Sequence, residues 1–187
     1  VMAIGRSFTE AIQKACQSLE NNAVGLGYYG KSMMHAEELL EYIKTPKWDR
    51  LFRIKDALQA GISVSSISKA TNGIDRWFLY EIQKIVTLEK ELEKFSLEDL
   101  PLSLLEEAKV EGFSDEQIAR IVRNGDEDAV YEKRKKAGIT RVYKMVDTCA
   151  AEFEAKTPYF YSTFEKGNHN ESIVSDRKKI IVLGSGP

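Results

Sequence analysis

Apolar residues recur every three or four positions along most of the chain, with charged residues between them. That spacing is typical of amphipathic helices. The longest pattern runs from 74 to 92, with apolar positions on one side and glutamates and lysines on the other. Shorter patterns lie at 8–19, 32–44, 46–60, 64–70, 101–111, 115–123 and 126–136. The sequence therefore predicts a mainly α fold, with a bundle of about seven helices between 21 and 141.

Local signals mark where these helices begin. Ser7 with Glu10, and Ser114 with Gln117, have the spacing of a capping box, in which the serine oxygen accepts a hydrogen bond from the backbone three residues on. Pro46 suits a first helical position, because its φ is fixed and it has no N–H to leave unpaired. These signals place helix starts near 8, 46 and 115.

One helical corner occurs twice in the sequence. Residues 56–67 and 107–118 both read as a helix, a glycine, an apolar residue, a serine and a second helix. Gly61 and Gly112 are expected to take the left-handed conformation that ends the first helix, and the following serine restarts backbone hydrogen bonding. The repeat predicts two helical hairpins that help to build the core.

The largest apolar side chains of the helical stretches are the expected core residues. Trp77 and Phe78 open the longest helix and are predicted to anchor the core there. The full expected set of core side chains is Trp48, Phe52, Ile74, Trp77 and Phe78.

The pattern changes after 141. Val142–Val146 alternates, and an aromatic run follows Pro158, which predicts an extended arm over 142–177. Short strands are expected at both ends, at Val1–Ile4 and Lys178–Leu183. The arm's aromatic residues are expected to contact a neighbouring domain; they are Phe153, Tyr159, Phe160 and Tyr161.

The charge balance bears on possible partners. The chain has 27 Lys+Arg against 29 Asp+Glu, a formal net charge of -2, which predicts no strong attraction to nucleic acid or anionic lipid. No apolar run approaches the ~20 residues of a membrane span, and no signal peptide opens the chain. A cytoplasmic protein with free thiols is expected, with a long-range disulfide between Cys16 and Cys149 as the alternative.

Candidate catalytic and metal-binding residues are few and scattered. The two histidines, His35 and His169, have no further ligands at metal-site spacing and are interpreted as surface residues. Cys149 has no basic partner at a suggestive spacing, and Glu152 and Glu154 do not form a recognisable carboxylate pair. The sequence predicts no catalytic residue and no metal site, with a small enzyme using Cys149 or Glu152 as a rival hypothesis.

A glycine turn after the last predicted strand is the one phosphate-type signal. Gly184, Ser185 and Gly186 would let backbone N–H groups approach a phosphate, but the helix that should follow is not in the sequence. It is interpreted as a truncated turn, so no complete cofactor site is expected.

The repeated corner also permits a helix-turn-helix reading. The second helix of such a module enters the DNA major groove with its N-terminal end toward the bases. Asp115 and Glu116 stand at that end of one candidate helix, which disfavours phosphate contacts. A nucleic-acid-binding module therefore stays as the alternative, not as the first interpretation.

Four phrases of the sequence carry a family resemblance. Residues 53–57, 72–79, 142–153 and 159–163 resemble, in order and spacing, the middle of the large chain of carbamoyl phosphate synthetase. That region is the helical oligomerisation domain between two homologous ATP-grasp halves. The resemblance implies that 1–20 is the tail of the first half, 21–141 the oligomerisation domain, 142–177 a connecting arm, and 178–187 the first strand and turn of the second half. Both ends are accordingly interpreted as cuts through a longer protein.

The resemblance also implies a function for the parent protein. It would make carbamoyl phosphate from bicarbonate, glutamine-derived ammonia and two ATP with Mg²⁺, for arginine and pyrimidine synthesis. The domain itself would hold no ATP or metal ligands. Its partners would be the flanking halves and other copies of itself, with a small glutaminase chain reached only through the parent. An allosteric role between the halves is left open.

Overall fold

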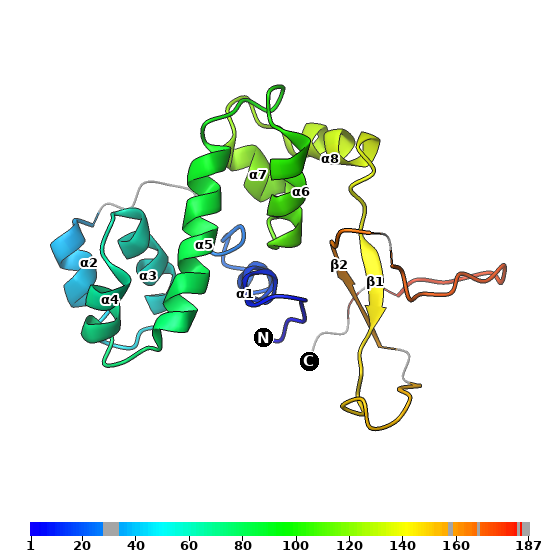
Figure 1. Ribbon diagram of the computed structural model, residues 1–187, viewed down its shortest axis with the longest axis horizontal. Helices are drawn as coiled ribbons and strands as arrows, with labels where there is room; N and C mark the ends of the chain where they lie inside the picture. Colours follow the sequence, from blue (N-terminus) through cyan, green and yellow to red (C-terminus); the bar gives the residue numbers. More distant parts are fainter. Residues whose placement is uncertain (28–33, 157–158, 168, 183, 185–187) are drawn as a thin grey trace.

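A computed structural model describes residues 1–27, 34–156, 159–167, 169–182 and 184. Within these ranges the chain forms eight helices and one two-stranded sheet (Figure 1). The elements are α1 (Phe8–Gln17), α2 (Ala36–Tyr42), α3 (Arg50–Gln59), α4 (Val64–Ala70), α5 (Arg76–Leu92), α6 (Leu102–Val110), α7 (Asp115–Ile121), α8 (Glu127–Lys136), β1 (Val142–Met145) and β2 (Phe160–Thr163). The predicted mainly α fold is confirmed.

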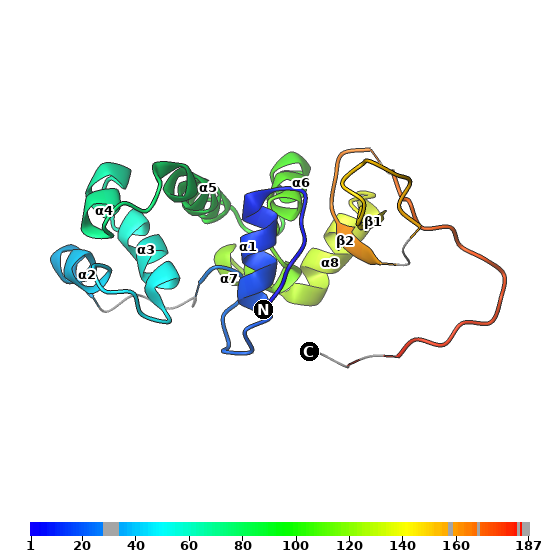
Figure 2. The same ribbon diagram turned by 90° about the horizontal axis from the view of Figure 1, so that it is seen from below.

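The helices form an elongated body with α5 at its centre (Figures 1 and 2). Helices α2, α3 and α4 lie at one end, α1 and α6–α8 on the other side of α5, and the β1–β2 hairpin beyond them. The inward stripe of α5 supplies Leu79, Ile82, Ile85, Val86 and Leu92 to one continuous apolar core. No helix of the described ranges has both the length and the apolar composition that a bilayer crossing needs.

The two repeated corners have the same backbone geometry. Gly61 and Gly112 both adopt left-handed conformations, with φ of 85° and 88°. In each corner the residue after the glycine donates its N–H to a carbonyl five residues earlier, as in a Schellman motif. The two bonds are Ile62 to Ala57 at 3.0 Å and Phe113 to Ala108 at 2.9 Å. The predicted helical hairpins are thus present at both places.

The serine caps of these corners are also formed. The hydroxyl oxygen of Ser63 accepts from the Ser66 N–H at 3.1 Å, and that of Ser114 from the Gln117 N–H at 2.9 Å. Each cap satisfies one N–H that the first helical turn leaves without a partner. Ser7 caps α1 in the same way, accepting from Glu10.

Helix α1 packs into the helical body. The side-chain amide of Gln13 donates to the backbone carbonyl of Glu111 at 3.0 Å and accepts from the Gln117 amide at 2.8 Å. Cys16 belongs to the main apolar core. Helix α1 thus contacts the α6–α7 corner, and the assignment of 1–20 to a preceding unit stays a prediction.

The prediction that Trp48 lies in the core is wrong. Its side chain is 79 % exposed, because the helix expected from Pro46 begins only at Arg50. The Arg50 guanidinium donates to the carbonyls of Ile43 and Thr71, which fixes the start of α3 and leaves Trp48 in the preceding turn. Phe52, inside α3, is buried in the core.

The prediction that Trp77 and Phe78 anchor the core is also wrong, since they are 53 % and 44 % exposed. Trp77 is two residues from the buried Leu79, which is about 200° around the helix, so it faces away from the core. Both residues stand on the first turn of α5, where the Phe8 ring of α1 packs against them. Ile74, before the helix, packs against the edge of the core.

The strands predicted at the two ends are absent from the described residues. Val1–Ile4 and 178–182 are in neither helix nor strand, and Ile180, Ile181 and Val182 are more than 80 % exposed. A strand needs a neighbour to pair its backbone N–H and C=O groups. Within the described part of the chain, no strand lies beside either segment to provide that pairing.

Candidate interaction surfaces

An exposed aromatic cluster lies where α1 meets the start of α5. The Phe8 ring is centred 5.4 Å from both the Trp77 and the Phe78 rings, and those two rings are 5.0 Å apart. The Phe8–Trp77 and Trp77–Phe78 pairs are edge-to-face, the favoured geometry of aromatic rings. The Asp75 carboxylate accepts from the Trp77 N–H at 2.7 Å and so fixes the turn that presents the rings. We call Phe8, Trp77 and Phe78 the aromatic cluster.

A buried ionic cluster joins α6, α7 and α8. The Lys109 ammonium donates to Asp115 at 2.7 Å and to the Phe113 carbonyl at 2.6 Å, and the Arg134 guanidinium donates to Asp115 at 2.8 Å. All three charged side chains are less than 10 % exposed. Two cations therefore share one carboxylate in a buried place, which is costly unless each group is hydrogen-bonded.

The pKa values of this cluster follow from that arrangement. Burial disfavours the charged ammonium and lowers the pKa of Lys109 to about 8, although the Asp115 carboxylate opposes this. Burial alone would raise the pKa of Asp115, but the charges and hydrogen bonds of Lys109 and Arg134 hold it below its ordinary value. The carboxylate therefore stays ionised and holds three helices together.

The β1–β2 hairpin is fastened to the helical body through Phe164, the residue after β2. The strands are antiparallel, with Val142 opposite Thr163 and Met145 opposite Phe160. The Phe164 ring centre lies 4.9 Å from the Lys109 ammonium, 5.3 Å from the Arg134 guanidinium and 5.7 Å from the Arg141 guanidinium. Cations over a ring face are attracted by its quadrupole. The predicted extended arm thus begins as a hairpin docked on the buried ionic cluster.

A cavity of about 450 Å³ opens between α1, the α6–α7 corner and the hairpin; we call it the junction pocket. Its charged lining residues are Glu10, Lys14, Lys109 and Arg141, and its apolar ones include Phe113 and Phe164. The Lys14 ammonium donates to the Ile4 and Ser162 carbonyls and pairs with Glu10 at 2.7 Å. It thereby ties α1 to the hairpin.

A second groove of about 450 Å³ runs between α5 and α6. Its apolar lining residues include Leu88 and Leu104, and its charged ones are Lys84, Glu91, Glu107 and Glu111. Lys84 pairs with Glu81 of the same helix at 2.6 Å, and Glu91 pairs with Lys94, just after the end of α5, at 2.6 Å. The groove is therefore acidic, whereas the junction pocket is basic.

The other residues singled out in the sequence do not converge on one site. His35 and His169 are both exposed, and within the described ranges no three His, Cys, Asp or Glu residues could hold one metal ion. Cys16 and Cys149 are free thiols, and burial raises the pKa of Cys16 to about 11. Gly184 has φ of 114°, while Ser185 and Gly186 lie outside the described residues.

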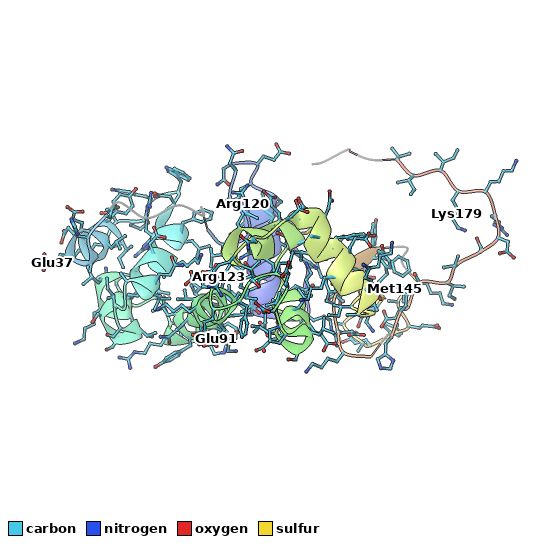
Figure 3. The ribbon with its side chains drawn as sticks, turned by 90° about the horizontal axis from the view of Figure 1, so that it is seen from above. Glu37, Glu91, Arg120, Arg123, Met145 and Lys179 are labelled. Carbon is cyan, nitrogen blue, oxygen red and sulfur yellow. The ribbon has the colours of Figure 1, made fainter. Side chains whose placement is uncertain are left out.

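The aromatic residues of the arm are presented to solvent in this chain. Phe153 is 75 % exposed, Tyr159 63 % and Phe160 46 %, and Tyr161 is partly exposed. Figure 3 shows the later part of the chain, around Lys179, well away from the helical body. The arm therefore carries apolar surface that the described residues of the chain do not cover.

Sequence reasoning missed the buried ionic cluster and the role of Phe8. Lys109 follows Leu105 by one helical turn on an apolar face, which was a usable signal for a buried lysine. Nothing in the sequence indicated that Asp115 and Arg134, on two further helices, would reach the same place. The pairing of Phe8 with Trp77 likewise depends on how α1 crosses α5.

Comparisons with known proteins agree on one family. The family model described as "Carbamoyl-phosphate synthetase large chain, oligomerisation domain" matches residues 1–138. Curated proteins named carbamoyl phosphate synthase large chain match the whole chain: 48 % identity in Archaeoglobus fulgidus, 46 % in Thermoanaerobacter pseudethanolicus and 43 % in Nostoc sp.. The chain spans 18 %, 17 % and 17 % of those proteins' lengths. This chain belongs to the oligomerisation-domain family of the carbamoyl-phosphate synthetase large chain.

Proposed function

We propose that this domain joins the two synthetic halves of a carbamoyl phosphate synthase large chain and that copies of it associate through the aromatic cluster. By this proposal the flanking halves perform the ATP- and Mg²⁺-dependent synthesis of carbamoyl phosphate from bicarbonate and glutamine-derived ammonia in the cytoplasm. The domain contributes no catalytic residue. The glutaminase chain is a partner of the parent protein only.

The exposed aromatic cluster is the observation that carries the self-association proposal. Large aromatic side chains dominate the energetics of protein interfaces, and contiguous exposed apolar patches mark interaction sites. Trp77 and Phe78 are held at fixed angles by Phe8 and by the Asp75 cap, so little side-chain entropy remains to be lost on binding. The neighbouring Tyr80, 53 % exposed on the same helix, extends the patch.

The arm supports the linking role. Phe153, Tyr159, Phe160 and Tyr161 are proposed to pack on a neighbouring domain of the parent protein, because the first three are largely exposed and Tyr161 is partly exposed in this chain. The helix-turn-helix alternative gains no support. Asp115, at the end of α7 that would face DNA, is instead occupied with Lys109 and Arg134.

Sedimentation of the chain over about 1–200 µM tests the association proposal. The weight-average sedimentation coefficient should rise with concentration, and the double variant Trp77→Ala/Phe78→Ala should weaken association at least tenfold, since such anchors contribute about 2 kcal/mol or more each. The Tm of the double variant should stay close to that of the unmodified chain, because neither ring is in the core.

Trp48→Ala is the matched control, since it removes an equally large exposed ring from another part of the body. Association should be unchanged in this variant. A chain that stays monomeric throughout the series would refute the proposal. The proposal would also be refuted if Trp77→Ala/Phe78→Ala associates as strongly as the unmodified chain.

A further inference from the structure

The junction pocket has an excess of positive charge. Of its charged lining residues within the described ranges, Lys14, Lys109 and Arg141 are cations and Glu10 is a carboxylate, so these residues carry three positive charges against one negative, a net +2. The adjacent Arg134 and Asp115 add one charge of each sign and leave that balance unchanged. A pocket with low-dielectric walls and one sign of charge concentrates ligands of the opposite sign.

Among the described residues that line the pocket, Arg141 is the cation that remains available to such a ligand. The three N–H groups of Lys14 are directed to Ile4, Ser162 and Glu10, and Lys109 is held by Phe113, Asp115 and the Phe164 ring. Arg141 touches the Phe164 ring but, among the described residues, has no hydrogen bond or ion pair. Its five N–H donors match the oxygens of a phosphate in a two-bonded arrangement.

The size and floor of the pocket limit the ligand further. About 450 Å³ falls in the range of small-molecule sites and far exceeds the volume of a bare phosphate ion. The partly exposed Phe164 ring gives the pocket an apolar side, with the buried Phe113 ring behind the pocket wall, so a bound anion would carry an organic group against Phe164. A phosphate monoester has between one and two negative charges near neutral pH, which suits a net +2 lining.

We propose that the junction pocket binds a small organic phosphate monoester, with the Arg141 guanidinium donating to the phosphate oxygens and the organic group packing against the Phe164 ring. The site lies between helices of the body and the strand of the hairpin. Its occupant would therefore add contacts between α1, the α6–α7 corner and the arm. This inference does not depend on self-association.

Calorimetric titration of the chain with phenyl phosphate tests the site. We expect a Kd on the order of 0.1–1 mM for a probe of this size. Arg141→Gln should weaken binding at least about tenfold, and Arg141→Lys, which keeps the charge but loses the fork, by less. Both variants should keep the Tm of the unmodified chain, because Arg141 is exposed and outside the core.

Arg120→Gln is the matched control. Arg120 is an exposed arginine of α7 paired with Glu116, and Figure 3 shows it away from the hairpin, where Met145 is labelled. Its binding of phenyl phosphate should equal that of the parent. Amide shifts in an NMR titration should map to Phe113, Ser114 and Thr163.

Four results would overturn the proposal. The first is no detectable binding at about 10 mM phenyl phosphate, well above the expected Kd. The second is that Arg141→Gln binds phenyl phosphate as tightly as the unmodified chain, and the third is that phenol or benzoate binds as tightly as phenyl phosphate. The fourth is that the amide shifts map outside the pocket. Inorganic phosphate binding as tightly as phenyl phosphate would also overturn the part assigned to the organic group.

Discussion

Gly61 and Gly112 occupy the same place in the two repeated corners but have different surroundings. Both have φ near 85–88°, a conformation that side chains with a Cβ disfavour. A Cβ on Gly61 would meet nothing within 4 Å, whereas one on Gly112 would lie 2.6 Å from the Glu10 Cα. The second corner therefore needs glycine twice over, for its own turn and for the close approach of α1.

The pair gives a stability prediction. Gly61→Ala should lower the free energy of unfolding by about 1–2 kcal/mol, the cost of the left-handed conformation alone. Gly112→Ala should cost about 2 kcal/mol more, since the α1 backbone must move away from the corner. Urea unfolding of both variants measures this. Equal losses would contradict the close approach of α1.

The sequence alone predicted both glycines as helix stops, because the repeat exposes their role in the backbone. It could not distinguish them, since the contact with Glu10 joins residues about a hundred positions apart. The same limit explains Trp48, Trp77 and Phe78. Their size predicted burial, but exposure depends on where a helix begins and on which neighbour covers its first turn.

At the scale of elements, caps and stops located most helices, whose ends fell within a few residues of the prediction. Ser63, Ser114 and the two glycines act through bonds to residues three to five positions away, so sequence reveals them. The start of α3 was misplaced because Arg50 is fixed by Ile43 and Thr71, carbonyls of other segments. Contacts between elements, such as the cluster of Lys109, Asp115 and Arg134, could not be predicted from local sequence patterns.

That cluster predicts how stability depends on pH. The pKa of Lys109 is about 8 in the folded chain against 10.5 when unperturbed. Between these values the unfolded chain binds more protons at this site, so the free energy of unfolding should rise with pH. Below pH 8 both states are protonated, and the cost of burying the ammonium is constant. The gain from pH 8 to 10.5 should be about 2 kcal/mol.

Lys109→Met isolates this contribution, because it keeps the length of the side chain and removes the titrating group. Denaturant unfolding of both proteins should show that, as pH rises from about 7.5 to 10.5, the free energy of unfolding of the unmodified chain increases relative to that of the variant. Tyrosines and other lysines titrate in both proteins and cancel in the difference. If the unmodified chain instead loses stability relative to the variant over this pH range, the lowered pKa of Lys109 in the folded chain is contradicted.

At the scale of the whole molecule, the helical body and the arm differ in what holds them. The body has one continuous core, from Cys16 in α1 to Val130 in α8. The hairpin has two four-residue strands, and such a pair is marginal without further packing. The strands predicted at the two ends are absent from the described residues for a related reason. A strand needs a partner from another segment, and the local sequence pattern does not reveal whether that partner is present.

Phe164 is the contact that should decide whether the hairpin stays docked. Its ring is shared by Lys109, Arg134 and Arg141, and partly buried cation–ring contacts contribute about 0.5–2 kcal/mol. In Phe164→Leu the apolar bulk remains but the ring face is lost. Amide hydrogen exchange in β1 and β2 should then accelerate about tenfold, while the α5 amides keep the parent's rates, because only local opening changes. Phe153→Ala, which removes an exposed ring from the segment between the strands, should leave both sets unchanged. If Phe164→Leu accelerates α5 as much as the hairpin, the ring stabilises the whole fold and the arm is not a separately opening unit.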